Sequence, residues 1–234
     1  MLPKILHQTD QAVYASKPSG MFVHPTDEQR GSGETLLTWI RDQVGQFVYP
    51  VHRIDRASSG IVCMGMSSES AAGLQSLIQD PQAIKSYLVL ARGDTDPKFE
   101  CDLPLSRKKK ETPVPALTRF RKIMGKNGFS LLEARIETGR RHQIRRHLAR
   151  LGHQVIGDST YGKGRINDSL RRDHGLPRLF LHAYLLDHPG ESPSISSHRQ
   201  IDPLPADLLV FLRLLFDEPH LFPGGFLEED VKTC

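Results

Sequence analysis

The segment that most restricts the possible folds runs from Ile84 to Ala91. Apart from Lys85 and Ser86 near its start, both of its alternating sets of side chains are apolar. A strand that is apolar on both faces has to be covered on both faces, so it belongs in the middle of a sheet. We therefore expect a fold organised around a β-sheet whose centre is buried.

The remaining strands are predicted from shorter apolar patterns. In the segment 129–137, apolar residues alternate with Glu133, Arg135 and Glu137, which is typical of a strand with one face in solvent. A strand and turn are expected at residues 11–25, with Lys17–Gly20 as the turn. Further strands are predicted at residues 61–64, 116–123 and 179–186.

Helices are predicted at residues 36–45, 68–80, 138–152 and 206–216, where apolar residues recur at helical spacing. Ser68 and Thr138 are the expected N-caps of the second and third helices. Residues 94–115, with the basic run Arg107–Lys110, are expected to be an exposed connection, and a polar loop is expected from 153 to 177. Strands outnumber helices without regular alternation, so the predicted class is α+β, with a mixed, mainly antiparallel sheet flanked by helices.

Composition limits the class of protein further. The chain has 234 residues, of which 38% are hydrophobic and 25% charged, and its net charge is +4. This is ordinary for a globular protein with a sizeable core. No apolar run approaches the roughly 18 residues of a membrane span, and no signal peptide is apparent, so a soluble cytoplasmic protein is expected. The three cysteines, Cys63, Cys101 and Cys234, form no C-x-x-C pair and are expected to be reduced.

A polar loop stands directly ahead of the predicted strand at Ile61. It places the carboxylate of Asp55 between Arg53 and Arg56. One interpretation is a solvated loop with surface ion pairs. The other is a carboxylate kept ionised by neighbouring guanidinium groups, which would depress its pKa and hold it as a nucleophile. The residues alone leave both interpretations open.

The third predicted helix is strongly cationic. Ile144, Leu148 and Leu151 commit one face of it to the core, and no acidic residue lies between Glu137 and Asp158. A merely solvated helix usually mixes the two signs of charge, so this pattern favours a face that binds a polyanion. Guanidinium forks suit phosphate oxygens. The basic side chains are therefore expected to fan out over the rest of this helix: Arg140, Arg141, His142, Arg145, Arg146, His147 and Arg150, with His153 beyond them.

Three other features have plainer interpretations. Tyr87 lies inside the buried strand and is by default a core tyrosine. Asp158 belongs to the segment Gly157–Gly162, where a structural turn is favoured over a catalytic carboxylate. The eleven histidines contain no H-E-x-x-H, and His142 and His147 are out of register for one helical face, so no metal site is expected.

Taken together, the motifs resemble the RluA family of pseudouridine synthases. The resemblance runs from about Lys17 to His188, with Ile54 where the family more often has Leu and Ser58 where it more often has Thr. The segments that carry it are His52-Arg53-Ile54-Asp55-Arg56-x-Ser58-Ser59-Gly60, Lys85-x-Tyr87, Thr138-Gly139-Arg140-x-His142-Gln143-Ile144-Arg145-x-His147, Gly157-Asp158 and Leu181-His182-Ala183.

The resemblance implies the pseudouridine synthase fold and its reaction. A uridine loses its glycosidic bond, the base rotates, and the bond reforms through carbon 5, with no cofactor. Asp55 matches the catalytic aspartate, Arg145 the arginine that pairs with it, and Tyr87 the tyrosine that packs on the target base. Arg53 matches the arginine that helps to fill the space left by the displaced base. The residues expected to bind RNA are Arg53, Arg56, Arg140, Arg141, His142, Arg146 and Arg150.

The implied partner is RNA. The ending Arg145-Arg146-His147 and the stretch 162–175 are most like the branch of the family that modifies uridine 65 in the T-stem of tRNA. Ribosomal RNA is the alternative substrate, and a non-catalytic RNA-binding protein, which would not need Asp55, is the alternative function. We expect one catalytic domain over residues 1–234, with no separate N-terminal RNA-binding domain, acting as a monomer.

Overall fold

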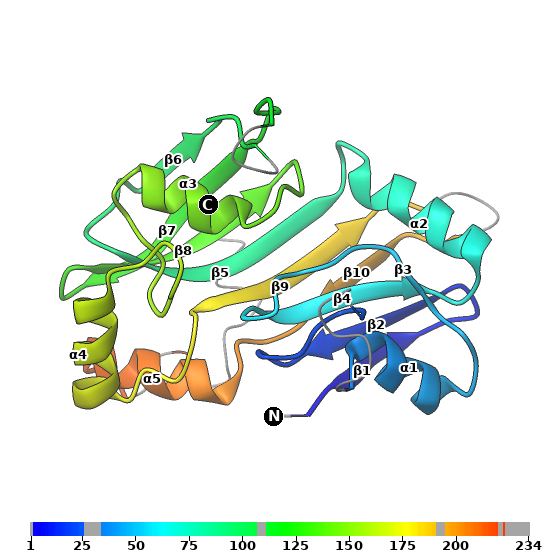
Figure 1. Cartoon of the computed structure of the whole chain (residues 1–234), viewed down its shortest axis with the longest axis horizontal. Helices are drawn as coiled ribbons and strands as arrows, with labels where there is room; N and C mark the ends of the chain where they lie inside the picture. The colour runs from blue at the N-terminus through cyan, green and yellow to red at the C-terminus, as the bar shows by residue number, and fades with distance from the viewer. Residues whose placement is uncertain (1, 26–33, 107–110, 191–194, 220–221, 223–234) are drawn as a thin grey trace. The chain divides into compact units, whose positions relative to one another are not determined.

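The computed structural model describes residues 2–25, 34–106, 111–190, 195–219 and 222, and Figure 1 shows their arrangement. The chain divides into two compact units. The first comprises Met1–Lys85 and Ala183–Asp202, and the second comprises Ser86–His182 and Pro203–Cys234. The chain passes between them within the strands β5 (Ile84–Arg92) and β9 (Leu181–His188), and again between Asp202 and Pro203.

The first unit contains a sheet and two helices. The helices are α1 (Leu36–Val44) and α2 (Ser68–Gln79). Tyr14, Ile61 and Cys63 of the sheet pack with Leu74 and Leu77 of α2. The strand order is β1 (Lys4–Gln8), β2 (Ala12–Lys17), β4 (Ser59–Gly65) and β9, with β3 (Tyr49–Pro50) paired to β4 and β10 (His198–Ile201) paired to β9.

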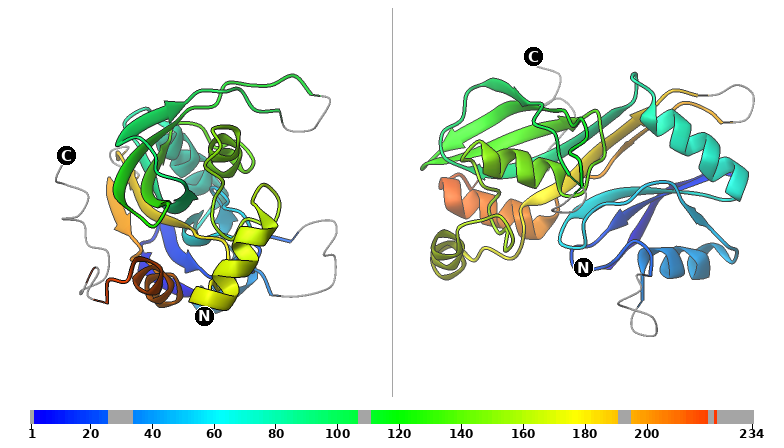
Figure 2. Two further views of the ribbon diagram at one scale, coloured as in Figure 1. Left: turned by 90° about the vertical axis from the view of Figure 1, so that its left-hand side faces the viewer. Right: turned by 45° about the horizontal axis from the view of Figure 1, so that its top comes forward.

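The second unit contains an antiparallel sheet and three helices. The strand order is β5, β8 (Phe129–Ile136), β7 (Thr118–Lys126) and β6 (Lys98–Cys101). The helices are α3 (Gln143–Arg150), α4 (Gly164–His174) and α5 (Ala206–Phe216). Helix α3 lies against one face of this sheet (Figure 2), where its Ile144 and Leu148 pack with residues of the strands, namely Val89, Phe120, Leu132 and Ala134.

The predicted fold class is confirmed: the fold is α+β, and every strand pair whose register is described is antiparallel. The prediction of a buried β5 is also confirmed, since residues 88–91 are fully buried. Helix α5 begins and ends where its periodicity predicts. Strands β7 and β8 are joined by Asn127 and Gly128, both at positive φ, which is the geometry of a tight two-residue hairpin.

Several predictions of local structure were wrong. The expected connection at 94–115 contains β6, and the expected loop at 153–177 contains α4. Strands β1 and β10 were also not predicted. The three strands have four or five residues each and depend on pairing with a neighbour, an interaction that their own patterns do not reveal. The basic run 107–110 lies outside the described residues.

Two predicted helix caps were also wrong. Ser67, not Ser68, caps α2, because its hydroxyl accepts the backbone N–H of Ser70 at 3.0 Å. Helix α3 starts at Gln143, so Thr138 stands outside it and donates instead to the Gln143 side-chain oxygen at 2.7 Å. The helix ends before Leu151, which is therefore 39% exposed rather than part of the apolar face.

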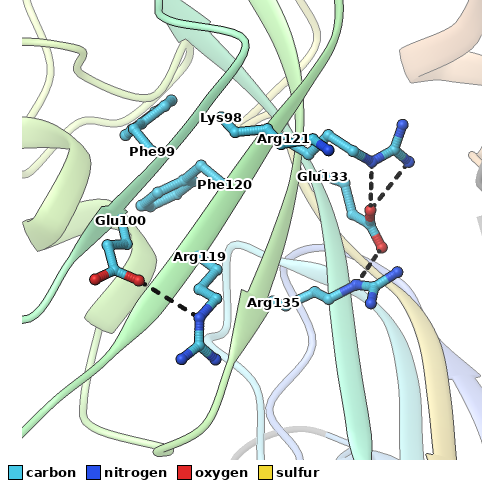
Figure 3. A pocket seen from close by; sticks show the side chains of 8 residues that line it. All are labelled: Lys98, Phe99, Glu100, Arg119, Phe120, Arg121, Glu133 and Arg135. Carbon is cyan, nitrogen blue, oxygen red and sulfur yellow. Dashed lines mark hydrogen bonds and ion pairs between the residues drawn. The ribbon is translucent and has the colours of Figure 1, made fainter. Parts of the chain in front are cut away.

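Glu133 was predicted to face solvent, but only 2% of it is exposed. Its carboxylate accepts the Ser86 hydroxyl at 2.7 Å. It also accepts the Nε–H groups of Arg135 and Arg121 at 2.9 and 3.1 Å, as Figure 3 shows. Burial would raise the pKa of Glu133, but these donors outweigh it and hold the pKa below its usual value. The carboxylate therefore stays ionised in the wall of a 420 Å³ cavity on the charged face of the sheet, lined also by Lys98, Glu100 and Arg119.

Two smaller points concern membranes and thiols. No helix in the described part of the chain is long and apolar enough to cross a membrane. Cys63 and Cys101 are free and buried, as expected of reduced structural cysteines, and Cys234 lies outside the described residues.

Gly60 provides a test of how closely β4 and β9 approach. Its φ is +117°, and a Cβ at this position would overlap the backbone carbonyl of Ala183 in β9. We expect Gly60→Ala to lower the free energy of unfolding by more than about 2 kcal/mol, measured by urea denaturation. The control is Gly128→Ala, which also has positive φ but no heavy atom near its added Cβ, and should cost only about 1 kcal/mol. Equal losses would contradict the role of the close approach.

Candidate active site

The loop at residues 51–58 leads into β4 and carries three of the predicted site residues. Ile54 is buried, Asp55 is half-buried, and Arg53 and Arg56 are exposed. The backbone N–H of Ser58 bonds to the carbonyl oxygen of Asp55 at 3.1 Å, which closes a turn around the acidic residue. The loop is therefore anchored by the buried Val51 and Ile54 and presents Arg53 and Arg56 to solvent.

A buried lysine ties down the end of this loop. Lys17 is completely buried, and its Nζ donates to the carbonyl oxygens of Ser58 and Arg56 at 2.7 and 3.3 Å. It also donates to those of Pro18 and Met21 at 2.8 and 2.9 Å. An ammonium group withdrawn from water needs such acceptors, because an unpaired buried charge is costly. Lys17 thus holds the backbone that follows Asp55.

A neutral histidine ties down the start of the loop. Nε2 of His52 accepts the backbone N–H of Cys63 in β4 at 3.0 Å. Burial, reinforced by the positive charge of Lys85, lowers the pKa of His52 to about 4. The imidazole is therefore unprotonated at neutral pH, which an acceptor at Nε2 requires.

The arginines on either side of Asp55 differ in their surroundings. Nε of Arg56 donates to the carbonyl oxygen of Gly20 at 2.9 Å, and its guanidinium lies 4.8 Å from the centre of the Phe22 ring. Arg56 therefore packs on the turn that follows β2, whereas Arg53 is exposed on the loop itself. The prediction that both bind RNA is not tested by these contacts.

Arg145 on α3 is buried rather than displayed. Its Nε and Nη2 donate to the two carboxylate oxygens of Asp158 at 2.7 and 2.9 Å, and both side chains are almost fully enclosed. Its guanidinium carbon lies 5.3 Å from the centre of the Tyr161 ring. The orientation of this guanidinium is therefore fixed by a bidentate ion pair and an aromatic ring.

The other basic residues of this stretch are more accessible. Arg140, Arg141 and Arg150 are exposed, and His142 and Arg146 are half-buried. Arg146 and Arg150 each donate one N–H, to the carbonyl oxygens of Ser106 and Pro104, both at 3.0 Å. Each such bond uses one of the five donors of a guanidinium and leaves its charge intact.

Not every basic residue of α3 reaches the surface. His147 is fully buried, with its ring nitrogens 2.9 Å from the Thr118 hydroxyl and 3.0 Å from the Leu103 carbonyl oxygen. Burial lowers the pKa of His147, and the charges of Arg150 and Arg146 lower it further. The prediction that the basic side chains fan out over the free face of α3 is therefore wrong for Arg145 and His147.

Tyr87 lies on β5 opposite Ala134 of β8. Its ring packs against the core that α3 shares with the sheet, yet the residue remains half-buried. The structure thus gives Tyr87 a supporting contact with the core and leaves part of it accessible to solvent. Its predicted contact with a target base remains a prediction.

The second unit brings together Arg145, Asp158, Tyr161 and His142, while Asp55, Arg53 and Arg56 lie on a loop of the first unit.

Sequence reasoning missed the roles of Lys17, His52 and Tyr161. Lys17 was interpreted only as part of a turn. The role of Tyr161 beside Arg145 could have been predicted, because Tyr161 stands three residues after Asp158 in the same short polar segment.

Three histidines of the first unit, His7, His188 and His198, pack with Tyr14 and with one another. Tyr14 and His188 form a hydrogen bond of 2.6 Å, and the rings of His7 and His198 stack with their centres 4.5 Å apart. Within the described residues, no group of three or more His, Cys, Asp or Glu side chains could hold a metal ion.

Known proteins share this architecture and its motifs. A sequence model of the RNA pseudouridylate synthase family matches residues 11–150. The tRNA pseudouridine synthase C of Vibrio vulnificus is 30% identical over 222 residues, covering 85% of this chain and 91% of that protein. That of Salmonella typhi is 34% identical over 209 residues, covering 80% of each. The structure of human RNA pseudouridylate synthase domain containing 1 matches with a TM-score of 0.72 at 22% identity, covering 87% of this chain and 84% of that one.

The buried imidazole of His52 predicts a pH dependence of stability. A histidine in the unfolded chain titrates near 6.5, so the unfolded state binds a proton more readily than the folded state does. The stability present above pH 6.5 should fall by up to about 3 kcal/mol as the pH drops to 4. His52→Gln should remove this part of the pH dependence, because the glutamine oxygen can replace Nε2 as acceptor but does not titrate.

Urea unfolding between pH 7 and pH 4 measures this effect. The control is His174→Gln at the end of α4, which leaves the hydrogen bond between His52 and Cys63 in place and should keep the contribution of His52 to the slope. The same slope in wild type and His52→Gln would show that His52 does not govern the acid sensitivity.

Proposed function

The chain belongs to the RNA pseudouridylate synthase family, and on that basis we propose that it converts one uridine of tRNA to pseudouridine, at position 65 of the T-stem. The observation that carries the choice of tRNA is the similarity to two bacterial tRNA pseudouridine synthase C proteins over at least 80% of this chain. The catalytic segment Asp55 to Arg145 lies entirely within the matched family region.

The reaction is an isomerisation. The bond between N1 of the base and C1′ of the ribose breaks, the base rotates, C5 bonds to C1′, and C5 loses its proton while N1 gains one. Substrate and product have the same atoms, so no oxidant, reductant or group donor is consumed. A base stacked in a stem cannot be reached by a carboxylate, so the nucleotide must first be flipped out, at a cost of a few kcal/mol.

In this proposal Asp55 is the catalytic carboxylate. It can attack C6 of the base, attack C1′ of the ribose, or remove a ribose proton to give a glycal, and each route requires it to be ionised. The resemblance implies that Arg145 pairs with it. The ion pair with Asp158 occupies one edge of the Arg145 guanidinium, and the five donors of an arginine allow a second carboxylate at another edge.

Two further residues act on the flipped nucleotide. The half-buried ring of Tyr87, supported by the core beneath it, packs on the target base. The exposed Arg53 helps to fill the space that the base leaves in the stack. The free energy for flipping comes from phosphate contacts, supplied by basic side chains: Arg56, Arg140, Arg141, His142, Arg146 and Arg150.

We also propose a simple organisation for the enzyme. Residues 1–234 act as one catalytic domain, as a monomer in the cytoplasm, without cofactor or metal. Chelation by EDTA should accordingly leave the rate unchanged.

The function is tested on an acceptor-plus-T-stem minihelix that carries the uridine. Wild type should form pseudouridine, and Asp55→Asn should reduce the single-turnover rate by at least about 10³-fold while the Kd for RNA stays within about twofold, because binding rests on phosphate contacts. The readout is base-specific mapping of pseudouridine together with filter binding.

Two results would contradict parts of this proposal. A rate of Asp55→Asn within tenfold of wild type would exclude Asp55 as the catalytic carboxylate. Modification of ribosomal RNA, with none of the minihelix, would exclude tRNA as the substrate.

Arg146 and Arg150 provide a separate test of RNA binding. Changing both to Gln should reduce the slope of log affinity against log salt by up to about 0.7 to 0.9 for each phosphate that is no longer bound. Single-turnover rates at saturating RNA should stay within about threefold of wild type. The control is Arg41→Gln on α1, an arginine paired with Asp42, which should leave the salt slope unchanged. A rate as low as that of Asp55→Asn would contradict the separation of binding from chemistry.

A further inference from the structure

The ion pair between Arg145 and Asp158 is almost completely enclosed. Only 6% of one side chain and none of the other is exposed. Two parallel N–H to oxygen bonds fix the plane of the guanidinium as well as its position. Buried ion pairs add little net stability, because removing both charges from water costs about as much as their attraction returns. The main effect of this pair is therefore to fix the position and orientation of the Arg145 guanidinium.

The carboxylate of Asp158 is itself held by the turn that carries it. Its Oδ1 accepts the backbone N–H groups of Thr160 and Tyr161 at 2.8 and 3.0 Å, in addition to Nη2 of Arg145. Burial would raise the pKa of Asp158, but the bonds from Arg145 and from these two N–H groups outweigh it and keep the pKa below its usual value. Asp158 is thus a fixed anion with both oxygens engaged.

A side chain from α4 holds the turn from outside. Asn167 is buried, its Oδ1 accepts the backbone N–H of Gly157 at 3.0 Å, and its Nδ2 donates to the carbonyl oxygen of Asp158 at 3.1 Å. Gly157 has a φ of +80°, and a Cβ there would overlap the carbonyl oxygen of Arg178. Neither Gly157 nor the backbone carbonyl of Asp158 can therefore shift without breaking a buried hydrogen bond.

The same turn also delivers an aromatic ring to Arg145. Tyr161 places its ring 5.3 Å from the guanidinium carbon, and its hydroxyl lies 3.1 Å from Nδ1 of His142, the residue that precedes α3. The guanidinium is therefore held by a carboxylate and an aromatic ring that both come from residues 157–162.

We propose that Asp158 is a positioning residue for the reaction, acting through Arg145, and that Asn167 holds Asp158 in place. Asp158 orients the guanidinium that serves the catalytic aspartate. This inference rests on the function proposed above for Arg145. The same contacts argue against Asp158 as the catalytic carboxylate, because a carboxylate whose two oxygens accept four N–H bonds is a poor nucleophile.

Asp158→Asn tests the role directly, because it keeps the size of the side chain and removes its charge. The single-turnover rate should fall about 100-fold, while KM and the Kd for RNA stay within about threefold of wild type. A rate within threefold of wild type in a folded variant would overturn the proposal.

The matched control is Asp207→Asn. Asp207 on α5 forms another bidentate arginine pair in the second unit, with Nε and Nη2 of Arg178 at 2.6 and 3.1 Å. Its loss should lower the thermal midpoint to a similar extent and leave the rate within about threefold of wild type. An equal loss of rate in both variants would show a general structural effect and overturn the proposal.

A double-mutant cycle asks whether Asp158 acts through Arg145. In an Arg145→Ala background, Asp158→Asn should slow the reaction by no more than about threefold, because no guanidinium remains to be oriented. A further 100-fold loss would mean that Asp158 acts independently, which overturns the proposal.

Asn167→Ala provides a second route if Asp158→Asn does not fold. It keeps the ion pair and removes the two bonds that hold the turn, so the rate should fall about 5- to 20-fold at unchanged KM. An unchanged rate would overturn the proposal. If the proposed function itself were wrong, the results would differ from these: wild type would be inactive on the minihelix, or Arg145→Ala would keep the wild-type rate.

Discussion

A cation removed from water has to be surrounded by acceptors, and this requirement shapes both segments that carry the candidate site. Lys17 is buried with its Nζ among backbone carbonyl oxygens, two of which belong to the loop around Asp55. Arg145 is buried against Asp158, whose carboxylate in turn orders residues 157–162. In each case the cost of burying the charge is offset only when the backbone adopts the conformation that supplies these acceptors. The buried charge therefore stabilises that backbone conformation over others.

The sheets supply the rigid support for these segments. In the first unit β4 begins where the loop of Asp55 ends, and the missing side chain of Gly60 lets it approach β9 closely. In the second unit the face of β5, β8 and β7 that packs on α3 is apolar, so it fixes Ile144 and with it the neighbouring Arg145. Precise catalytic groups benefit from such support, because loops alone position side chains less well than strands and helices do.

Burial divides the basic residues of the segment 140–150 into two groups. Arg145 and His147 are enclosed and have specific partners, whereas Arg140, Arg141 and Arg150 remain exposed. An enclosed guanidinium interacts in a low dielectric and can orient a group, while an exposed one acts mainly through its long-range attraction for phosphates. A helix with one type of charge can therefore contribute both to chemistry and to binding.

The sequence by itself determined the α+β class, the buried strand β5 and the bounds of α5, because periodicity is a local property. It singled out Asp55 and Arg145 as candidate residues only through the resemblance of its motifs to a known family. Only the tertiary structure decided that Glu133 is buried, that Thr138 does not cap α3 and that residues 164–174 form a helix. It also decided the roles of Lys17, His52 and Asp158, each of which depends on a partner at least 11 residues away. Such partners meet only when the chain is folded, and a polar residue gives no local sign of whether a distant donor or acceptor will offset its burial.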